Sequence, residues 1–360
     1  MINSIGYSVF LSTFKNQKEQ LSSLYKEGNF IFTSFHISEE YDNTYIQRAK
    51  DMCTYLNTWG YRIIADVSIN TLKLFHAGSL LELAKMLNVS ILRIDYGFSE
   101  DEILKLAKEF PVCINASTVT SDFAEKLSSN SLDIYAMHNY YPRPETGLDE
   151  EQFQIRNKML LSKGFKLLAF IPGDADKRGP IYEGLPTLEA HRYIAPYAAF
   201  ISLLSYNIDG VFIGDGIISQ FQANMISQYQ NSNIYTLPVI FEKEYEYLYN
   251  KEFTIRTDSP SWLKRLQESR VNGANQDILP NHCTERTTGS ITIDNNRYQR
   301  YSGEIQIIVE NLPADERVNV IGQLPKEYHL LLKNIMNGLK IRFVKPMEES
   351  KMFQKEQEHQ

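Results

Sequence analysis

The sequence has few cysteines and no excess of positive charge, and both shortages exclude classes of protein. Three cysteines, Cys53, Cys113 and Cys283, occur in 360 residues, without the spacing of a disulfide framework or a zinc site. We therefore predict a reducing compartment, the cytoplasm, and no structural metal. The formal net charge of −7 at pH 7 argues against broad nucleic-acid binding, because neutralising phosphates requires a basic surface.

Long apolar runs and glycine-rich phosphate loops are also missing. No stretch approaches the roughly 18 apolar residues of a membrane span, and no basic region precedes an apolar run at the N-terminus. We predict neither a membrane segment nor a membrane partner. The first strand-like run, residues 5–12, lacks the glycine-rich turn that follows the first strand of a dinucleotide-binding fold. We expect no cofactor.

Short apolar runs separated by segments of helical periodicity make up the first two thirds of the chain. Helical spacing is clear in residues 45–56, 80–87 and 103–107. Alternating strands and helices predict βα units, and eight of them predict a (β/α)8 barrel over residues 1–235. The later runs predict a smaller β-rich domain over residues 236–350 and a polar tail over 351–360. The eight runs are residues 5–12, 30–37, 61–68, 91–97, 111–118, 133–142, 166–173 and 209–215.

A barrel places its functional residues at the C-terminal ends of its strands. Asp95 and Asp174 would lie nearly opposite each other across the ring, as two carboxylates that hydrolyse a glycosidic bond do. Asp66 and Asp215 are reserve candidates for the same roles. Each aspartate could instead cap the helix that follows it. The predicted strand ends carry Ser12, His36, Asp66, Asp95, Asn115, His138, Asn139, Asp174 and Asp215.

The loop after the sixth run carries further polar side chains on a backbone stiffened by two prolines. His138 and Asn139 could hydrogen-bond sugar hydroxyls or an acetamido group, because both are neutral donors and acceptors. Tyr141 and Arg143 project from the same stretch. A stiff turn whose polar groups are satisfied internally is the alternative interpretation.

The loop after the seventh run supplies positive charge and one more acid. Lys177 and Arg178 could bind a phosphate or carboxylate, and Glu183 could be a protonated acid if it is partly buried. Lys177 and Arg178 could equally form a solvated loop tip. In the second domain, Arg286 and Arg297 could close over an anionic ligand at the barrel or serve as turn residues.

A metal site built from His36, His138, His191 and an aspartate ranks below a metal-free site, because no His-x-His or HExxH spacing supports it. We predict no metal.

One stretch, His138-Asn-Tyr-Tyr-Pro-Arg-Pro-Glu-Thr-Gly-Leu148, closely resembles the signature of a bacterial family that includes the 6-phospho-N-acetylmuramidases. The family was formerly labelled as of unknown function or as outer surface proteins. Departures are mild: Tyr140 stands where the family has Phe, Phe35 where it has Leu and Ser38 where it has Pro. The resemblance continues through residues 32–40, 64–68, 92–98, 115–118, 178–189, 213–215 and 289–304.

The resemblance implies a TIM barrel followed by a cyclophilin-like β domain. It further implies a cytoplasmic glycosidase that cleaves the β-1,4 bond of N-acetylmuramic acid 6-phosphate–N-acetylglucosamine during peptidoglycan recycling. Such a substrate carries a phosphate and a lactyl carboxylate, which Arg143, Lys177, Arg178 and Arg297 could bind. Its 2-acetamido group also permits substrate-assisted hydrolysis.

Two other functions stay open from the sequence. One is a barrel isomerase or lyase that acts on another phosphosugar, and the other is a phosphosugar sensor without catalysis. The predicted partner is a small phosphorylated disaccharide, and a homo-oligomer is compatible with the sequence.

Overall fold

The computed structural model of the chain describes residues 4–25, 28–129, 133–216, 218–269 and 277–347. The chain divides into two compact units, residues 1–219 and 220–360, whereas the sequence placed the boundary after residue 235. The predicted tail, residues 351–360, lies outside the described residues. None of the helices in the described part of the chain is long and apolar enough to cross a membrane.

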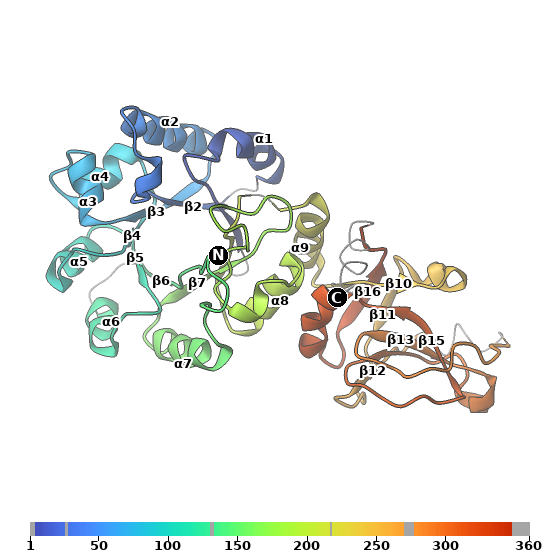
Figure 1. Cartoon of the computed structure of the whole chain (residues 1–360). Coiled ribbons are helices and arrows are strands. Elements are labelled where there is room, and N and C mark those ends of the chain that lie inside the picture. The colour runs from blue at the N-terminus through green and yellow to red at the C-terminus, as the bar shows by residue number, and fades with distance from the viewer. Residues whose placement is uncertain (1–3, 26–27, 130–132, 217, 270–276, 348–360) are drawn as a thin grey trace. The chain divides into compact units, whose positions relative to one another are not determined.

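Eight parallel strands of the first unit follow one another in chain order and close into a barrel (Figure 1). The last strand pairs with the first, where Tyr7 lies opposite Ile213. Seven strands fall within the predicted runs and β1 begins one residue before its run, so the predicted TIM barrel is confirmed. The strands are β1 Ser4–Ser8, β2 Phe30–Ser34, β3 Arg62–Val67, β4 Ile91–Ile94, β5 Val112–Asn115, β6 Ile134–Met137, β7 Lys166–Ile171 and β8 Gly210–Ile213.

Helices of the first unit lie outside this ring of strands (Figure 1). Local sequence explains several helix starts; before α5, Ser99 and Glu102 form a reciprocal capping box. The helices are α1 Phe14–Leu24, α2 Tyr45–Thr58, α3 Ile69–Leu74, α4 Leu80–Leu87, α5 Glu100–Ala107, α6 Ser121–Ser128, α7 Glu150–Leu161 and α8 Pro196–Ser205, with 3-10 turns η1 Ser38–Glu40 and η2 Glu189–His191.

The interior of the barrel is filled by large apolar side chains from alternate strand positions. Ile64 and Ile91 belong to this core, so Asp66 and Arg93, two residues further along their strands, are on the same inner face. The sequence alternation therefore carries charged groups to the C-terminal ends of β3 and β4. The core residues are Phe10, Phe30, Phe32, Ile64, Ile91, Cys113, Tyr135, Met137, Leu168, Phe170 and Phe212.

The second unit is β-rich, as predicted, and its described residues form two sheets. One has five strands in the order β10-β15-β13-β14-β12, and the other has three in the order β11-β16-β9. Its elements are α9 Gln220–Ser232, β9 Tyr235–Pro238, β10 Ile240–Phe241, η3 Lys243–Leu248, β11 Glu252–Thr254, β12 Leu263–Arg265, β13 Ser290–Asp294, η4 Asn296–Tyr301, β14 Ile305–Ile308, β15 Val318–Gln323, η5 Lys326–Asn334 and β16 Lys340–Val344.

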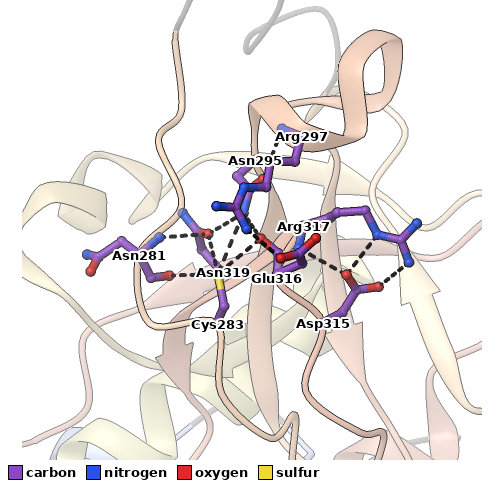
Figure 2. A network of polar contacts seen from close by, with 8 residues as sticks. All are labelled: Asn281, Cys283, Asn295, Arg297, Asp315, Glu316, Arg317 and Asn319. Carbon is purple, nitrogen blue, oxygen red and sulfur yellow. Dashed lines mark hydrogen bonds and ion pairs between the residues drawn. The ribbon is translucent and has the colours of Figure 1, made fainter.

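A polar network ties the loops of the second unit to β15 (Figure 2). The side-chain oxygen of Asn319 accepts hydrogen bonds from the side chain of Asn295 at 2.8 Å and from the backbone of Asn281 at 3.1 Å. Both Asn295 and Asn319 are buried. Because buried amides need partners, this network fixes the loop around Cys283.

Candidate functional site

A buried ion pair forms where β3 and β4 reach the C-terminal end of the barrel, which we call the barrel mouth. Nη1 of Arg93 donates to Oδ1 of Asp66 at 2.5 Å, and the two residues are register partners in adjacent strands. Asp66 is 5% exposed and Arg93 is 4% exposed. Charges this deeply buried are retained only when they are paired.

His36 and Asp95 complete a group of four residues that we call the mouth cluster, with Asp66 and Arg93. Nε2 of His36 lies 3.6 Å from Oδ2 of Asp66 and 3.6 Å from Oδ2 of Asp95. Nη1 of Arg93 lies 3.9 Å from Oδ1 of Asp95. The structure thus brings two predicted carboxylates and one predicted histidine together at the C-terminal ends of β2, β3 and β4.

The acidity of Asp95 is altered by its surroundings. Partial burial and the nearby charge of Asp66 raise the pKa of Asp95, and the opposing effects of Arg93 and His36 are smaller. Asp95 therefore keeps its proton to higher pH than an ordinary aspartate. A carboxyl with a raised pKa beside a second carboxyl that is paired with arginine is an arrangement in which the two acids can take different roles.

Arg93 also reaches the loop that follows β6. Its Nη2 donates to Oδ1 of Asn139 at 2.5 Å, and Oγ1 of Thr187 donates to the carbonyl oxygen of Asn139 at 2.9 Å. Asn139 is two residues beyond Met137, which belongs to the barrel core, so its side chain is on the inner face. The predicted binding residue Asn139 thus contacts the mouth cluster.

Arg178 lies at the mouth on the loop after β7. Its guanidinium carbon is 3.7 Å from the centroid of the Phe10 ring, and Nη1 is 3.4 Å from the hydroxyl of Tyr140. No carboxylate of the described residues forms an ion pair with it. Arg178 is thus a partly buried cation with an aromatic support and without an acidic partner, as an anion-binding residue would be.

Comparison with known proteins identifies the family. A profile described as 6-phospho-N-acetylmuramidase, N-terminal, matches residues 5–228, and one described as 6-phospho-N-acetylmuramidase, C-terminal, matches residues 233–344. The chain belongs to the 6-phospho-N-acetylmuramidase family. The name indicates a glycosidase. No curated protein matches the chain.

Two solved structures resemble this 6-phospho-N-acetylmuramidase family member over nearly its whole length. A conserved protein of unknown function from Enterococcus faecalis is 32% identical, with a TM-score of 0.81, over 98% of this chain and 99% of that chain. An uncharacterized B. cereus protein is 22% identical, with a TM-score of 0.76, over 96% of this chain and 100% of that chain. The B. cereus likeness bears on the fold alone.

Asp215 organises the loop after β7. Its two carboxylate oxygens accept backbone N–H groups from Gly173 at 2.8 Å, Arg178 at 2.9 Å and Leu185 at 3.1 Å. Asp215 is fully buried, and this burial raises its pKa against the effect of the three hydrogen bonds. These three hydrogen bonds indicate that Asp215 holds the shape of the loop that carries Arg178.

Asp174 and Glu183 have partners in the same part of the chain. Asp174 accepts hydrogen bonds from the backbone and hydroxyl of Ser219 at 2.7 and 2.6 Å. Glu183 accepts one from the Tyr193 hydroxyl at 3.1 Å. Asp174 and Glu183 both belong to the loop after β7, whereas Asp66 lies near the end of β3 and Asp95 follows β4. A catalytic role for Asp174, Glu183 or Asp215 stays a prediction.

His138 faces away from the barrel interior. Its Nε2 lies 2.8 Å from Oδ1 of Asn157 on α7 and its Nδ1 lies 3.4 Å from the Ser117 hydroxyl. Burial lowers the pKa of His138 to about 4, so it is neutral at pH 7. Asn115 accepts the backbone N–H of Ser117 at 2.9 Å and thereby holds the turn after β5. These contacts are structural ones.

The histidines named for a metal site are held separately. His191 lies 3.1 Å from the hydroxyl of Ser202 on α8, while His138 contacts Asn157 and His36 contacts the two aspartates. Within the described ranges, no three histidine, cysteine or acidic side chains are grouped to hold a metal ion.

The loop after β6 is fixed by a second ion pair, Glu189 with Arg192, which we call the loop clamp. Glu189 accepts two hydrogen bonds from the Arg192 guanidinium, each 2.6 Å long, and the backbone N–H groups of Glu145 and Gly147 at 2.9 and 2.8 Å. The Arg192 hydrogen bonds are the main reason that the pKa of Glu189 is lowered to about 2. The clamp therefore stiffens the family signature.

Arg192 extends the loop clamp to a second loop. Its guanidinium donates to the carbonyls of Tyr141 at 3.0 Å, Arg143 at 3.1 Å and Gly184 at 3.2 Å. One buried side chain thus joins the loop after β6 to the loop after β7. The exposed Arg143 side chain and the half-buried Tyr141 are carried on this frame.

The other predicted cations have contacts of their own. Nζ of Lys177 lies 5.8 Å from the centroid of the Tyr193 ring. In the second unit, Arg286 donates to the carbonyl of Pro313 at 2.9 Å, and Arg297 pairs with Glu316 at 2.7 Å (Figure 2). Their roles in ligand binding stay predictions.

Sequence reasoning missed Arg93, Glu189 and Arg192. Arg93 interrupts the apolar run of β4, and a charged residue at an inner position of such a run predicts a buried ion pair. Glu189 and Arg192 are three residues apart, a spacing that allows pairing in a helical turn. Nothing in the sequence indicates that the pair also holds two loops.

Proposed function

We propose that this chain is a cytoplasmic glycoside hydrolase that cleaves the β-1,4 bond of N-acetylmuramic acid 6-phosphate–N-acetylglucosamine. The observation that carries the proposal is the mouth cluster, in which the carboxylates of Asp66 and Asp95 each lie 3.6 Å from one nitrogen of His36. Family membership supplies the reaction class. A pair of carboxyl groups at one site suits glycoside hydrolysis.

The two acids take different roles in this proposal. Asp95, whose pKa is raised, gives its proton to the bridging oxygen as the bond from C1 to that oxygen breaks. Asp66, paired with Arg93, stabilises the positive charge that develops at C1, or attacks C1 to form a bond that water then breaks by displacing the Asp66 carboxylate. Water then adds its hydroxide to C1 and returns its proton to Asp95. In a substrate-assisted variant, the acetamido oxygen attacks C1 in place of Asp66.

Arg178 supplies affinity for the anionic substrate. Its guanidinium lacks an acidic partner among the described residues, and a phosphate or a lactyl carboxylate could accept two hydrogen bonds from it. Positive charge at the mouth would steer the substrate despite the net charge of −7. Lys177, which precedes Arg178 on the same loop, and Arg143, on the loop after β6, would assist.

The cellular location of the enzyme follows from the proposed substrate. A disaccharide taken up and phosphorylated during peptidoglycan recycling is found in the cytoplasm, so the enzyme belongs there. We further propose that the second unit is cyclophilin-like, which its two β-sheets support, and that Arg286 or Arg297 assists in binding the anion.

The test is release of N-acetylglucosamine from the phosphorylated disaccharide and from its unphosphorylated twin. We expect cleavage of the phosphorylated sugar alone. Arg178→Ala should raise KM at least about tenfold, because a charge-assisted hydrogen bond contributes about 1.5–3 kcal/mol. Failure of the parent protein to cleave either sugar would contradict the proposal.

Arg62→Ala is the matched control. Arg62 also stacks on a phenylalanine, with its guanidinium carbon 4.6 Å from the centroid of the Phe30 ring. It is the first residue of β3, whereas Asp66 is near the end of the same strand. Removing this arginine should leave KM unchanged. An equal rise in KM for Arg62→Ala and Arg178→Ala would mean that Arg178 acts through stability alone.

A further inference from the structure

The buried guanidinium of Arg93 is divided between two acceptors. Nη1 donates to Asp66 and Nη2 donates to Asn139, each at 2.5 Å. A guanidinium has only donors, so the Asn139 amide must present its oxygen to Arg93. The NH2 group of the same planar amide then points away from Arg93.

The backbone of Asn139 is held as firmly as its side chain. Thr187 donates its hydroxyl to the Asn139 carbonyl at 2.9 Å and accepts the backbone N–H of Phe170 at 2.9 Å. The preceding residue, His138, donates its N–H to the Leu168 carbonyl at 2.9 Å. Asn139 is thus anchored to β7 through two neighbouring backbone positions.

The NH2 group of Asn139 has no acceptor among the described residues, and the side chain is only half-buried. Two hydrogen-bond donors with a fixed direction are therefore available beside the mouth cluster. Such a pair suits a neutral acceptor such as an amide carbonyl oxygen. An anion would be bound better by the arginine at position 178, which lies on the next loop.

We propose that Asn139 donates a hydrogen bond to the acetyl carbonyl oxygen of the substrate's 2-acetamido group, and that Arg93 is the positioning residue that fixes this orientation. The inference rests on the proposed function. The acetamido group is on C2, next to the C1 atom at which Asp66 and Asp95 act, and Arg93 joins Asn139 to those acids. The 6-phosphate is on the far side of the sugar ring. Asn139 thereby selects N-acetylated sugars.

Calorimetric titration of the full chain with two ligands tests the inference. The first is N-acetylmuramic acid 6-phosphate, and the second is 3-O-lactylglucose 6-phosphate, in which a hydroxyl replaces the acetamido group. The parent protein should bind the first about tenfold more tightly, which corresponds to one hydrogen bond of about 1.4 kcal/mol.

Asn139→Asp should abolish this preference, because a carboxylate still accepts from Arg93 but has no donors. The added charge weakens both anionic ligands, so the ratio of the two affinities is the relevant quantity. Asn139→Ala should likewise bring the ratio near one. Arg93→Lys should reduce the ratio with Asn139 in place, since a single ammonium cannot hold Asp66 and Asn139 in the same fork.

Each outcome supports or overturns a separate statement. A parent protein that binds neither ligand overturns the proposed function. A parent protein that binds both equally, or a preference that survives in Asn139→Asp and Asn139→Ala, overturns the role of Asn139 while the proposed function stands. A full preference in Arg93→Lys overturns the positioning role of Arg93.

Discussion

The two sides of the barrel mouth use carboxylates in different ways. After β3 and β4, Asp66 and Asp95 face the ionisable side chains of Arg93 and His36. Asp215, which follows β8, uses both oxygens to accept backbone N–H groups from the loop after β7. A carboxylate bound to backbone amides is committed to loop shape, whereas one that faces other titratable groups can change its protonation with a ligand.

The largest expected effect is on kcat, and it distinguishes Asp95 from Asp215. Asp95→Asn should lower kcat on the phosphorylated disaccharide about a thousandfold, because the amide cannot deliver a proton. Asp215→Asn should mainly lower the thermal unfolding temperature, since an amide has one oxygen to replace two. Hydrolysis assays and thermal unfolding of both variants check this. Equal losses of activity at unchanged stability would remove the distinction.

The contribution of the loop clamp to stability can be measured by removing Arg192. Arg192→Ala should lower the free energy of unfolding by about 3 kcal/mol, because it leaves carbonyls and Glu189 without their partner. This loss is at the lower end of the usual range because the Glu189 side chain is 31% exposed and can regain water. Urea unfolding measures the loss.

Arg297→Ala is the matched control for the loop clamp. The Arg297–Glu316 pair is exposed, and such pairs contribute at most about 1 kcal/mol. A loss in Arg297→Ala as large as that in Arg192→Ala would show that burial does not distinguish the two pairs.

A smaller, pH-dependent effect is expected from Glu189. Its folded-state pKa is lowered from 4.5 to about 2, so the carboxylate stabilises the fold above pH 4.5 and this stabilisation is lost as the pH falls towards 2. Glu189→Gln should therefore be less stable than the parent at pH 6. The difference should shrink between pH 4.5 and pH 3 in a series of thermal melts. A difference in stability that stays constant from pH 6 to pH 3 would contradict the lowered pKa of Glu189.

Asp95 should give the smallest effect, with the opposite sign. Its folded-state pKa is raised, so its contribution to stability is present at low pH and is lost as the pH rises through that pKa. Asp95→Asn should be slightly more stable than the parent at pH 7 and should lose that advantage at pH 3. Lower stability of Asp95→Asn at pH 7 would contradict the raised pKa of Asp95.

Much of the barrel could be predicted because strand and helix periods are local properties of the sequence. The strand-end rule also brought His36, Asp66, Asp95 and Asn139 to one region. It could not rank Asp215 against Asp95, because the backbone groups that occupy Asp215 come from a loop whose path no local pattern specifies.

The alternation of side chains between the two faces of a strand predicts which way His138 and Arg93 point. Tyr135 and Met137 face the barrel interior, so His138 must face the helices, where it contacts Asn157. The same alternation places Arg93 inside the barrel. The sequence could not predict that Arg192 joins two loops, because this contact depends on where three backbone carbonyls lie in space.

The loop clamp also sets the smallest piece of this barrel that can be exchanged. Arg192 contacts carbonyls in residues 141–143 and at Gly184, and Glu189 contacts the backbone at residues 145 and 147. Grafting either loop alone onto a related barrel would leave half of these groups without partners. Recombination within the family should therefore preserve residues 138–192 as a single inherited block.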